Sequence, residues 1–172
     1  RLAHPTLRAA ATAATFAMPA ADIAQADVIV IVGSNLRHEL PLVHQRVRKA
    51  WTRGAKVHVV NPVDFDFTFD IAGKHIVAPS QIAATLSDAA LTQAAKAGTH
   101  AVVIVGALAE NGPHAAAIRK AAADFAAATG AALDRIPQGA NAVGLSDYGV
   151  LPIARDAQAM LADARTAYIL YG

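Results

Sequence analysis

The sequence contains no cysteine. This excludes disulfide bonds, thiolate catalysis, cysteine-ligated zinc and any iron–sulfur cluster held by this chain's own residues. Charge is also scarce: charged residues make up 16% of the 172 residues, and 15 Lys and Arg against 13 Asp and Glu leave a net charge of +2. Such a balance excludes a protein that binds nucleic acid through bulk electrostatics. With 55% hydrophobic residues, the chain is expected to fold around a core.

Long hydrophobic runs are missing as well. The uncharged run Ala9–Ala21 is interrupted by Pro19 and is shorter than the roughly 20 apolar residues of a membrane span, so we expect no membrane insertion. The first twenty residues resemble a secretory signal only weakly, because Phe16 and Met18 are the only bulky apolar residues where such a signal needs many. The chain opens with Arg1, and we interpret it as a piece of a longer protein.

Short apolar runs rich in β-branched residues are present instead. Such runs predict strands of a parallel sheet that is buried on both faces. We expect buried strands over Val28–Val32, Val57–Val60 and Ala101–Val105, and weaker strands over His75–Val77 and Tyr168–Tyr171.

Helical patterns separate these runs. From Glu39 to Thr52, apolar residues recur at steps of three and four and form one face. The other expected helices run from Ser80, as N-cap, to Lys96, from Asn111 to Thr129 with Gly130 as the stop, and over Arg155–Arg165, with an irregular loop over Ile136–Pro152.

This alternation predicts an α/β fold: an open, mostly parallel, doubly wound (Rossmann-like) sheet with helices on both faces. Ligands of such sheets bind beyond the carboxyl ends of the strands, which points to Gly33, Ser34 and Asn35 after the first strand and to Asn61 at the end of the second. Gly33 permits close backbone approach, and a following helix start favours an anion. However, the fingerprint G-x-G-x-x-G is missing, since the next glycine is Gly54, and no P-loop is present.

The remaining polar residues of the sequence show no pattern that is typical of a catalytic centre. The cluster Arg37-His38-Glu39 is interpreted as a solvated helix cap without a nucleophile and base, and the histidines show no metal-binding spacing. The segment Asp64–Asp70 alternates acidic or polar residues with phenylalanines. A carboxylate metal site is one interpretation, and the favoured one is an extended loop whose phenylalanines attach it to the core or to a partner.

Several separated motifs occur together in this order along the sequence. They are Ala26–Val28, Gly33–Asn35, Glu39–Leu42, Arg46–Trp51, Val63-Asp64 and Thr68–Asp70. As a set they closely resemble the molybdopterin-oxidoreductase-like domain of the large iron–sulfur subunit of respiratory complex I, the NADH:quinone oxidoreductase (the 75-kDa subunit in mitochondria and the corresponding subunit in bacteria). The resemblance is strong over residues 26–73 and looser beyond.

The resemblance implies a subunit whose N-terminal part binds 4Fe-4S and 2Fe-2S clusters and carries electrons from NADH toward quinone. Residues 1–172 would be a fragment of its C-terminal, molybdopterin-oxidoreductase-like domain, which is inactive alone and holds no cofactor. The implied partners are other domains of the same subunit and neighbouring peripheral-arm subunits of complex I. The implied location is the cytoplasmic face of the bacterial inner membrane.

The sequence departs from working molybdopterin enzymes at three places. Leu36 replaces the proline of Gly-x-Asn-Pro, the run Asn61–Asp64 puts an acid where phosphates would lie, and Pro79–Ile82 replaces Pro-Gly-Thr-Asp. These changes indicate a vestigial dinucleotide crevice. A fragment of an active molybdopterin guanine dinucleotide oxidoreductase is the alternative, and an NAD-dependent or other nucleotide-binding domain is a third.

Overall fold

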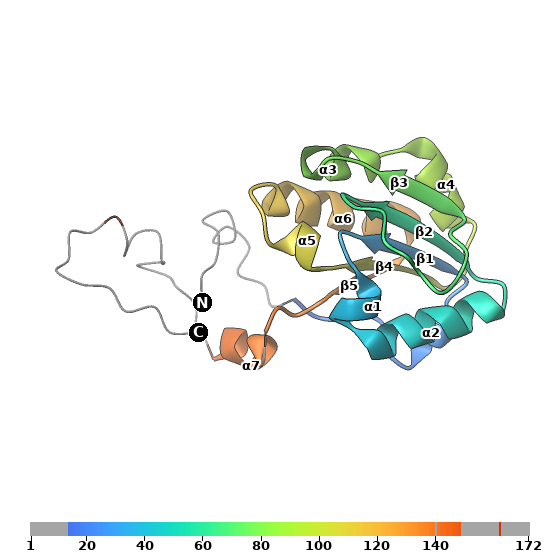
Figure 1. The fold of residues 1–172 in the computed structure, drawn as a ribbon, viewed down its shortest axis with the longest axis horizontal. Coiled ribbons are helices and arrows are strands. Elements are labelled where there is room, and N and C mark those ends of the chain that lie inside the picture. Colours follow the sequence, from blue (N-terminus) through green and yellow to red (C-terminus); the bar gives the residue numbers. More distant parts are fainter. Residues whose placement is uncertain (1–13, 140, 149–161, 163–172) are drawn as a thin grey trace.

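The computed structural model describes residues 14–139, 141–148 and 162. Its centre is a five-stranded sheet in the order β3-β2-β1-β4-β5, and all four pairs of neighbouring strands are parallel (Figure 1). This confirms the predicted open, doubly wound sheet. The strands are β1 (Val28–Val32), β2 (Lys56–Asn61), β3 (Gly73–Ile76), β4 (Ala101–Val105) and β5 (Ala132–Arg135).

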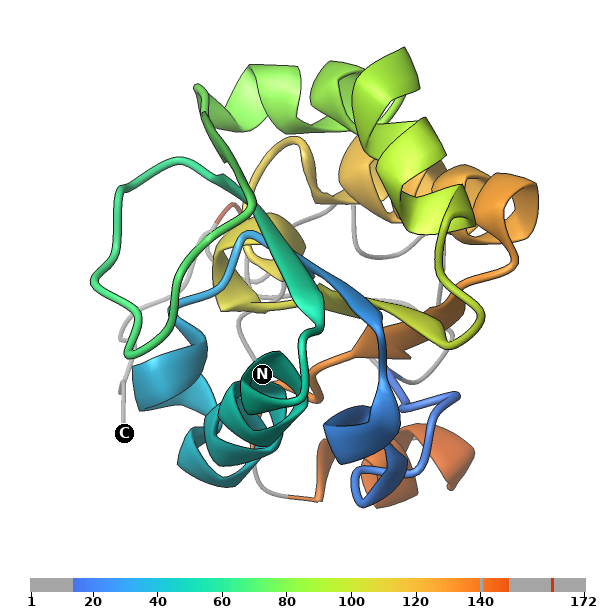
Figure 2. The same ribbon diagram turned by 90° about the vertical axis from the view of Figure 1, so that its right-hand side faces the viewer.

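Helices connect most of the strands and cover both faces of the sheet. In Figure 1, α3 and α4 lie above the sheet and α2 lies below it, and the turned view in Figure 2 shows the yellow-orange α6 on the same side as the green helices α3 and α4. The helices are the 3₁₀ turns η2 (Asp22–Gln25) and η3 (Pro79–Gln81), and the α-helices α1 (Leu36–Glu39), α2 (Pro41–Thr52), α3 (Ile82–Thr85), α4 (Ala89–Lys96), α5 (Ala107–Glu110), α6 (Ala115–Thr129) and α7 (Ala142–Asp147).

The central strand β1 contributes to two separate cores. Val28, Val30 and Val32 pack with apolar residues of α3, α4 and α6 on one face. Ile29 and Ile31 pack on the other face with η2 and α2. All five side chains are buried, which explains why the strand is an unbroken apolar run rather than an alternating one.

The helix expected over Glu39–Thr52 is two helices. Pro41 begins α2, and Leu40 before it has a non-helical backbone with φ −142° and ψ 81°. A residue before proline is disfavoured in the helical conformation, which explains the break between α1 and α2. The predicted face is confirmed by the buried residues Val43 and Val47.

The single helix expected from Ser80 to Lys96 is also wrong. Ser80 lies inside η3, and the chain leaves the helix after α3 before α4 begins. The Asp88 carboxylate accepts a hydrogen bond from the Leu91 N–H at 2.9 Å and is the true N-cap. A good cap at this point favours a new helix start over a continuous helix. The helix expected from Asn111 to Thr129 begins later than predicted, at Ala115, whereas its end at Thr129 is confirmed and Gly130 closes it with φ 74°.

Strand β5 was missed because Asp134 and Arg135 interrupt its apolar pattern. It lies at the edge of the sheet, where the Thr15 carbonyl accepts from Arg135 N–H at 2.8 Å and the Met18 N–H donates to the Asp134 carboxylate at 2.8 Å. Burial raises the pKa of Asp134, and hydrogen bonds from the Met18 and Ala17 backbone partly oppose that rise.

Helix α7 lies within the stretch Ile136–Pro152, which was expected to be an irregular loop. The expected strand Tyr168–Tyr171 lies outside the described residues, and of the expected helix Arg155–Arg165 only residue 162 is described. Within the described ranges, no helix has the length and hydropathy that crossing a bilayer requires.

Candidate functional site: a crevice at the switch point of the sheet

The order of the sheet reverses direction between β1 and β4. The strands β2 and β3 lie on one side of β1, whereas β4 and β5 lie on its other side. Ligands of doubly wound sheets bind at the carboxyl ends of the strands at such a switch point. The predicted residues gather there: Gly33, Ser34 and Asn35 follow β1, and Asn61 ends the adjacent β2. Gly106, which follows β4 on the other side of the crevice, was not predicted as part of the site.

Ser34 and Asn61 are fully buried and bind each other. The Ser34 N–H donates to Asn61 Oδ1 at 2.8 Å, and Asn61 Nδ2 donates to the Ser34 carbonyl at 3.0 Å. The amide side chain therefore extends the pairing of β1 and β2 by one residue and holds the loop after β1 in place. The side-chain amide of Asn61, which was predicted to line the ligand crevice, is therefore engaged by the backbone of Ser34.

Glu39 is not the solvated cap that the sequence suggested. Its Oε2 accepts a hydrogen bond from Ser34 Oγ at 2.6 Å, and its Oε1 accepts from the Ala107 N–H at 2.6 Å and from Gln138 Nε2 at 3.2 Å. The carboxylate thus joins the loop after β1 to the first residue of α5 and to the segment after β5. No local sequence pattern could indicate this role, since Ala107 lies 68 residues away along the sequence.

The loops after β1 and β4 also touch through their backbones. Gly33 has φ +57°, and its carbonyl accepts from the N–H groups of Leu108 and Ala109 at 2.9 and 3.3 Å. A Cβ atom at Gly33 would lie 2.5 Å from the Ala109 Cβ, and one at Gly106 would lie 2.4 Å from the Ser34 Cβ. Both glycines are required here by close approach, and the contacts close the crevice at its base.

These contacts decide whether the implied dinucleotide fits. A phosphate needs backbone N–H and hydroxyl donors that are free to face it. Here the Ala107 N–H and the Ser34 hydroxyl both donate to Glu39, and the Asn61 amide binds Ser34. The residues as arranged therefore do not fit a bound phosphate.

The acid in the crevice is a different one from the acid that the sequence indicated. Asp64 was expected to stand where phosphates would lie, but it is exposed and forms an ion pair with Lys74 at 2.8 Å. Glu39 is an acid that the sequence did not indicate, and it lies directly against Ser34 and Ala107 in the loops of the crevice. Asn35 keeps a side chain that makes no capping hydrogen bond at the start of α1.

A buried ionic cluster lies beside the crevice and was not predicted. Arg135 donates through Nε and Nη2 to the two carboxylate oxygens of Glu110 at 2.7 and 3.0 Å, and Arg119 Nη1 donates to Glu110 Oε2 at 3.3 Å. All three side chains are largely buried. The cluster connects α5, α6 and β5, so it fixes the backbone that carries Ala107.

The alternation over Asp64–Asp70 is confirmed. Phe69 is buried, Phe65 and Phe67 are half-buried, and the acidic or polar residues between them are exposed. Phe67 stacks on the buried His44 with ring centroids 6.4 Å apart, and Phe69 packs against the same ring at a tilt with centroids 5.1 Å apart. Burial, followed by the charges of Arg37 and Arg48, lowers the pKa of His44.

The phenylalanine row therefore packs largely on the protein's own core rather than standing free as a patch. The other interpretation of this segment, a carboxylate metal site, finds no support. Within the part of the chain that the structure describes, no three His, Asp or Glu side chains gather in a metal-binding group.

A family model covers the residues that form the sheet and the crevice. The model for molybdopterin oxidoreductases matches residues 2–168. This match spans nearly the whole sequence, including the five strands and both sides of the switch point. The chain belongs to the molybdopterin oxidoreductase family.

Proposed function

We propose that this chain is a non-catalytic structural domain of the large iron–sulfur subunit of a complex I-type NADH:quinone oxidoreductase. The observation that carries the proposal is the Glu39 carboxylate, which accepts hydrogen bonds from both loops of the crevice. Two unit charges about 4 Å apart at an effective dielectric constant near 20 interact by about 4 kcal/mol. A phosphate entering the crevice must therefore displace Glu39 or bring a cation with it.

The motifs from Ala26 to Asp70 support the assignment to complex I, since they resemble the subunit of that complex as a set. In this proposal, the 4Fe-4S and 2Fe-2S clusters are held elsewhere in the subunit, because this chain has no cysteine. The domain contacts other domains of its subunit and neighbouring subunits of the peripheral arm at the cytoplasmic face of the membrane. It supports the electron path without carrying electrons.

The alternative is a fragment of an active molybdopterin guanine dinucleotide oxidoreductase. Asn35 favours it, because its side chain lies beside the start of α1 and makes no capping hydrogen bond. In that case Glu39 would have to turn out of the crevice and release the Ser34 hydroxyl and the Ala107 N–H.

Calorimetric titration separates these functions. GDP serves as the nucleotide half of the dinucleotide. NADH tests the third alternative, an NAD-dependent or other nucleotide-binding domain. We expect neither to bind the protein with a Kd below about 1 mM, which corresponds to a binding free energy of about −4 kcal/mol. A GDP complex tighter than this that is lost in Asn35→Ala would contradict the proposal and support the alternative.

Metal analysis of the whole subunit tests the same proposal independently. We expect iron in cluster amounts and no molybdenum. Molybdenum in a stoichiometric amount would contradict the non-catalytic role.

A further inference from the structure

The connection between β2 and β3 is made without a helix. Parallel strands need a crossover connection. In this sheet, each of the remaining connections contains helices. Residues 62–72 instead form an irregular loop, with bends at both ends and near its middle, from the end of β2 back to the start of β3. At the β3 edge of the sheet, this segment takes the place that a crossover helix would occupy.

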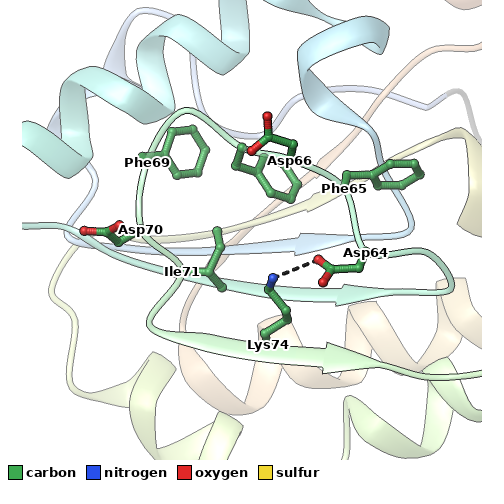
Figure 3. A pocket seen from close by; sticks show the side chains of 8 residues that line it. Asp64, Phe65, Asp66, Phe69, Asp70, Ile71 and Lys74 are labelled. Carbon is green, nitrogen blue, oxygen red and sulfur yellow. Dashed lines mark hydrogen bonds and ion pairs between the residues drawn. The ribbon is translucent and has the colours of Figure 1, made fainter.

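This segment forms one wall of an open cavity of about 510 Å³ (Figure 3). The volume is in the range of sites that hold a side chain or a small ligand. Three phenylalanines and Ile71 supply its apolar surface, and three aspartates and Lys74 supply its polar groups.

The charges of this cavity are predominantly negative. Asp64 is paired with Lys74 at 2.8 Å, whereas Asp66 lies 3.7 Å from Arg37 with its side chain 92% exposed. Asp70 makes no ion pair or hydrogen bond with any described residue. Exposed pairs such as Asp66 with Arg37 contribute little, so Asp66 and Asp70 remain available to an incoming cation.

Two exposed apolar side chains lie next to residues that line the cavity in sequence or along β3. Val63, next to Asp64, is 49% exposed, and Ile76, which shares a face of β3 with Lys74, is 42% exposed. β3 is an edge strand of the sheet, so this surface has no covering strand beside it.

We propose that this cavity is a docking site for an arginine side chain on an apolar segment of a partner polypeptide. A guanidinium is planar, stacks on aromatic rings and pairs with carboxylates, so it matches a cavity with phenylalanine walls and acidic edges. The apolar neighbours of that arginine would lie on Val63 and Ile76. The inference does not depend on the proposed function, because it holds whatever the crevice at β1 and β4 binds.

The test is an NMR titration of the ¹⁵N-labelled 172-residue chain with the peptide acetyl-Leu-Arg-Leu-amide at low ionic strength. We expect saturable shift changes confined to residues 63–76. A peptide with citrulline in place of arginine keeps the shape without the charge, and we expect it to bind at least fivefold more weakly.

Variants assign the binding to these side chains. We expect the double variant Asp66→Asn with Asp70→Asn to weaken binding at least fivefold and Phe65→Ala at least threefold. The matched control is Asp124→Asn, an exposed aspartate on α6, which should leave binding unchanged. Circular dichroism checks that each variant is folded.

Three results would overturn the inference. They are the absence of saturable changes at residues 63–76, an equal response to acetyl-Leu-Glu-Leu-amide, and equal affinity of the double asparagine variant and the control.

Discussion

Removing the Glu39 carboxylate should destabilise the fold, although this side chain is only half-buried. In Glu39→Ala, the Ser34 hydroxyl and the Ala107 N–H lose their acceptor, and Gln138 loses one of its partners. Hydrogen bonds to a charged group contribute about 1.5–3 kcal/mol each. Since water can replace part of the lost contacts, we expect a loss of about 2–4 kcal/mol in the free energy of unfolding.

Urea unfolding measures this loss. With a slope of about 2 kcal/mol per M, the middle of the usual range, the midpoint should fall by roughly 1–2 M. Glu39→Gln keeps one acceptor oxygen, and the Ser34 hydroxyl can rotate to accept from the new amide, so this variant should lose about 1 kcal/mol. Asp124→Ala, whose partner is the exposed Lys120 on the same helix, is the control and should change stability by no more than about 0.5 kcal/mol.

A double-mutant cycle distinguishes the specific contact from general damage. Because Ser34 and Glu39 bind each other directly, Ser34→Ala and Glu39→Ala should couple by about 1 kcal/mol or more. Additive effects, or a Glu39→Ala variant as stable as the Asp124→Ala control, would refute the role assigned to this carboxylate.

Three further changes test the remaining features. Gly33→Ala should lower the free energy of unfolding by about 2–5 kcal/mol in thermal unfolding, because the residue has φ +57° and its Cβ would meet Ala109. Gly130→Ala, at a residue with φ +74° and open space around it, should cost about 1–2 kcal/mol. Glu110→Ala should cost about 3–5 kcal/mol in urea unfolding, since it leaves two buried arginines without their carboxylate, and a loss below about 1 kcal/mol would contradict this. Burial raises the pKa of Asp134 in the folded protein above its ordinary 3.8. The free energy of unfolding therefore falls as the pH rises from the pKa of the unfolded chain toward the pKa of the folded protein. Asp134→Asn should therefore be more stable than the original protein at neutral pH and should lose this advantage as the pH falls to the ordinary pKa of 3.8. A difference in stability that stays constant across that pH range would contradict this prediction.

The sequence determined the central strands of the sheet and their positions in the chain. Val28–Val32 and Ala101–Val105 are apolar at every position, and only a strand covered on both faces buries all of these side chains. The alternation over Asp64–Asp70 likewise decided which side chains face the core, because successive residues of an extended segment point to opposite sides. These features are local, and local periodicity is visible in a sequence.

The tertiary structure alone decided the character of the crevice. The partners of Glu39 lie up to 99 residues away along the sequence and include a backbone N–H, which every residue except proline carries. The place of Asp134 in a strand was also decided by a distant contact. Its carboxylate accepts a hydrogen bond from the Met18 N–H, which lies more than a hundred residues earlier in the sequence. Whether a carboxylate faces solvent or closes a site depends on which loops the sheet brings together, and that juxtaposition exists only once the protein has folded.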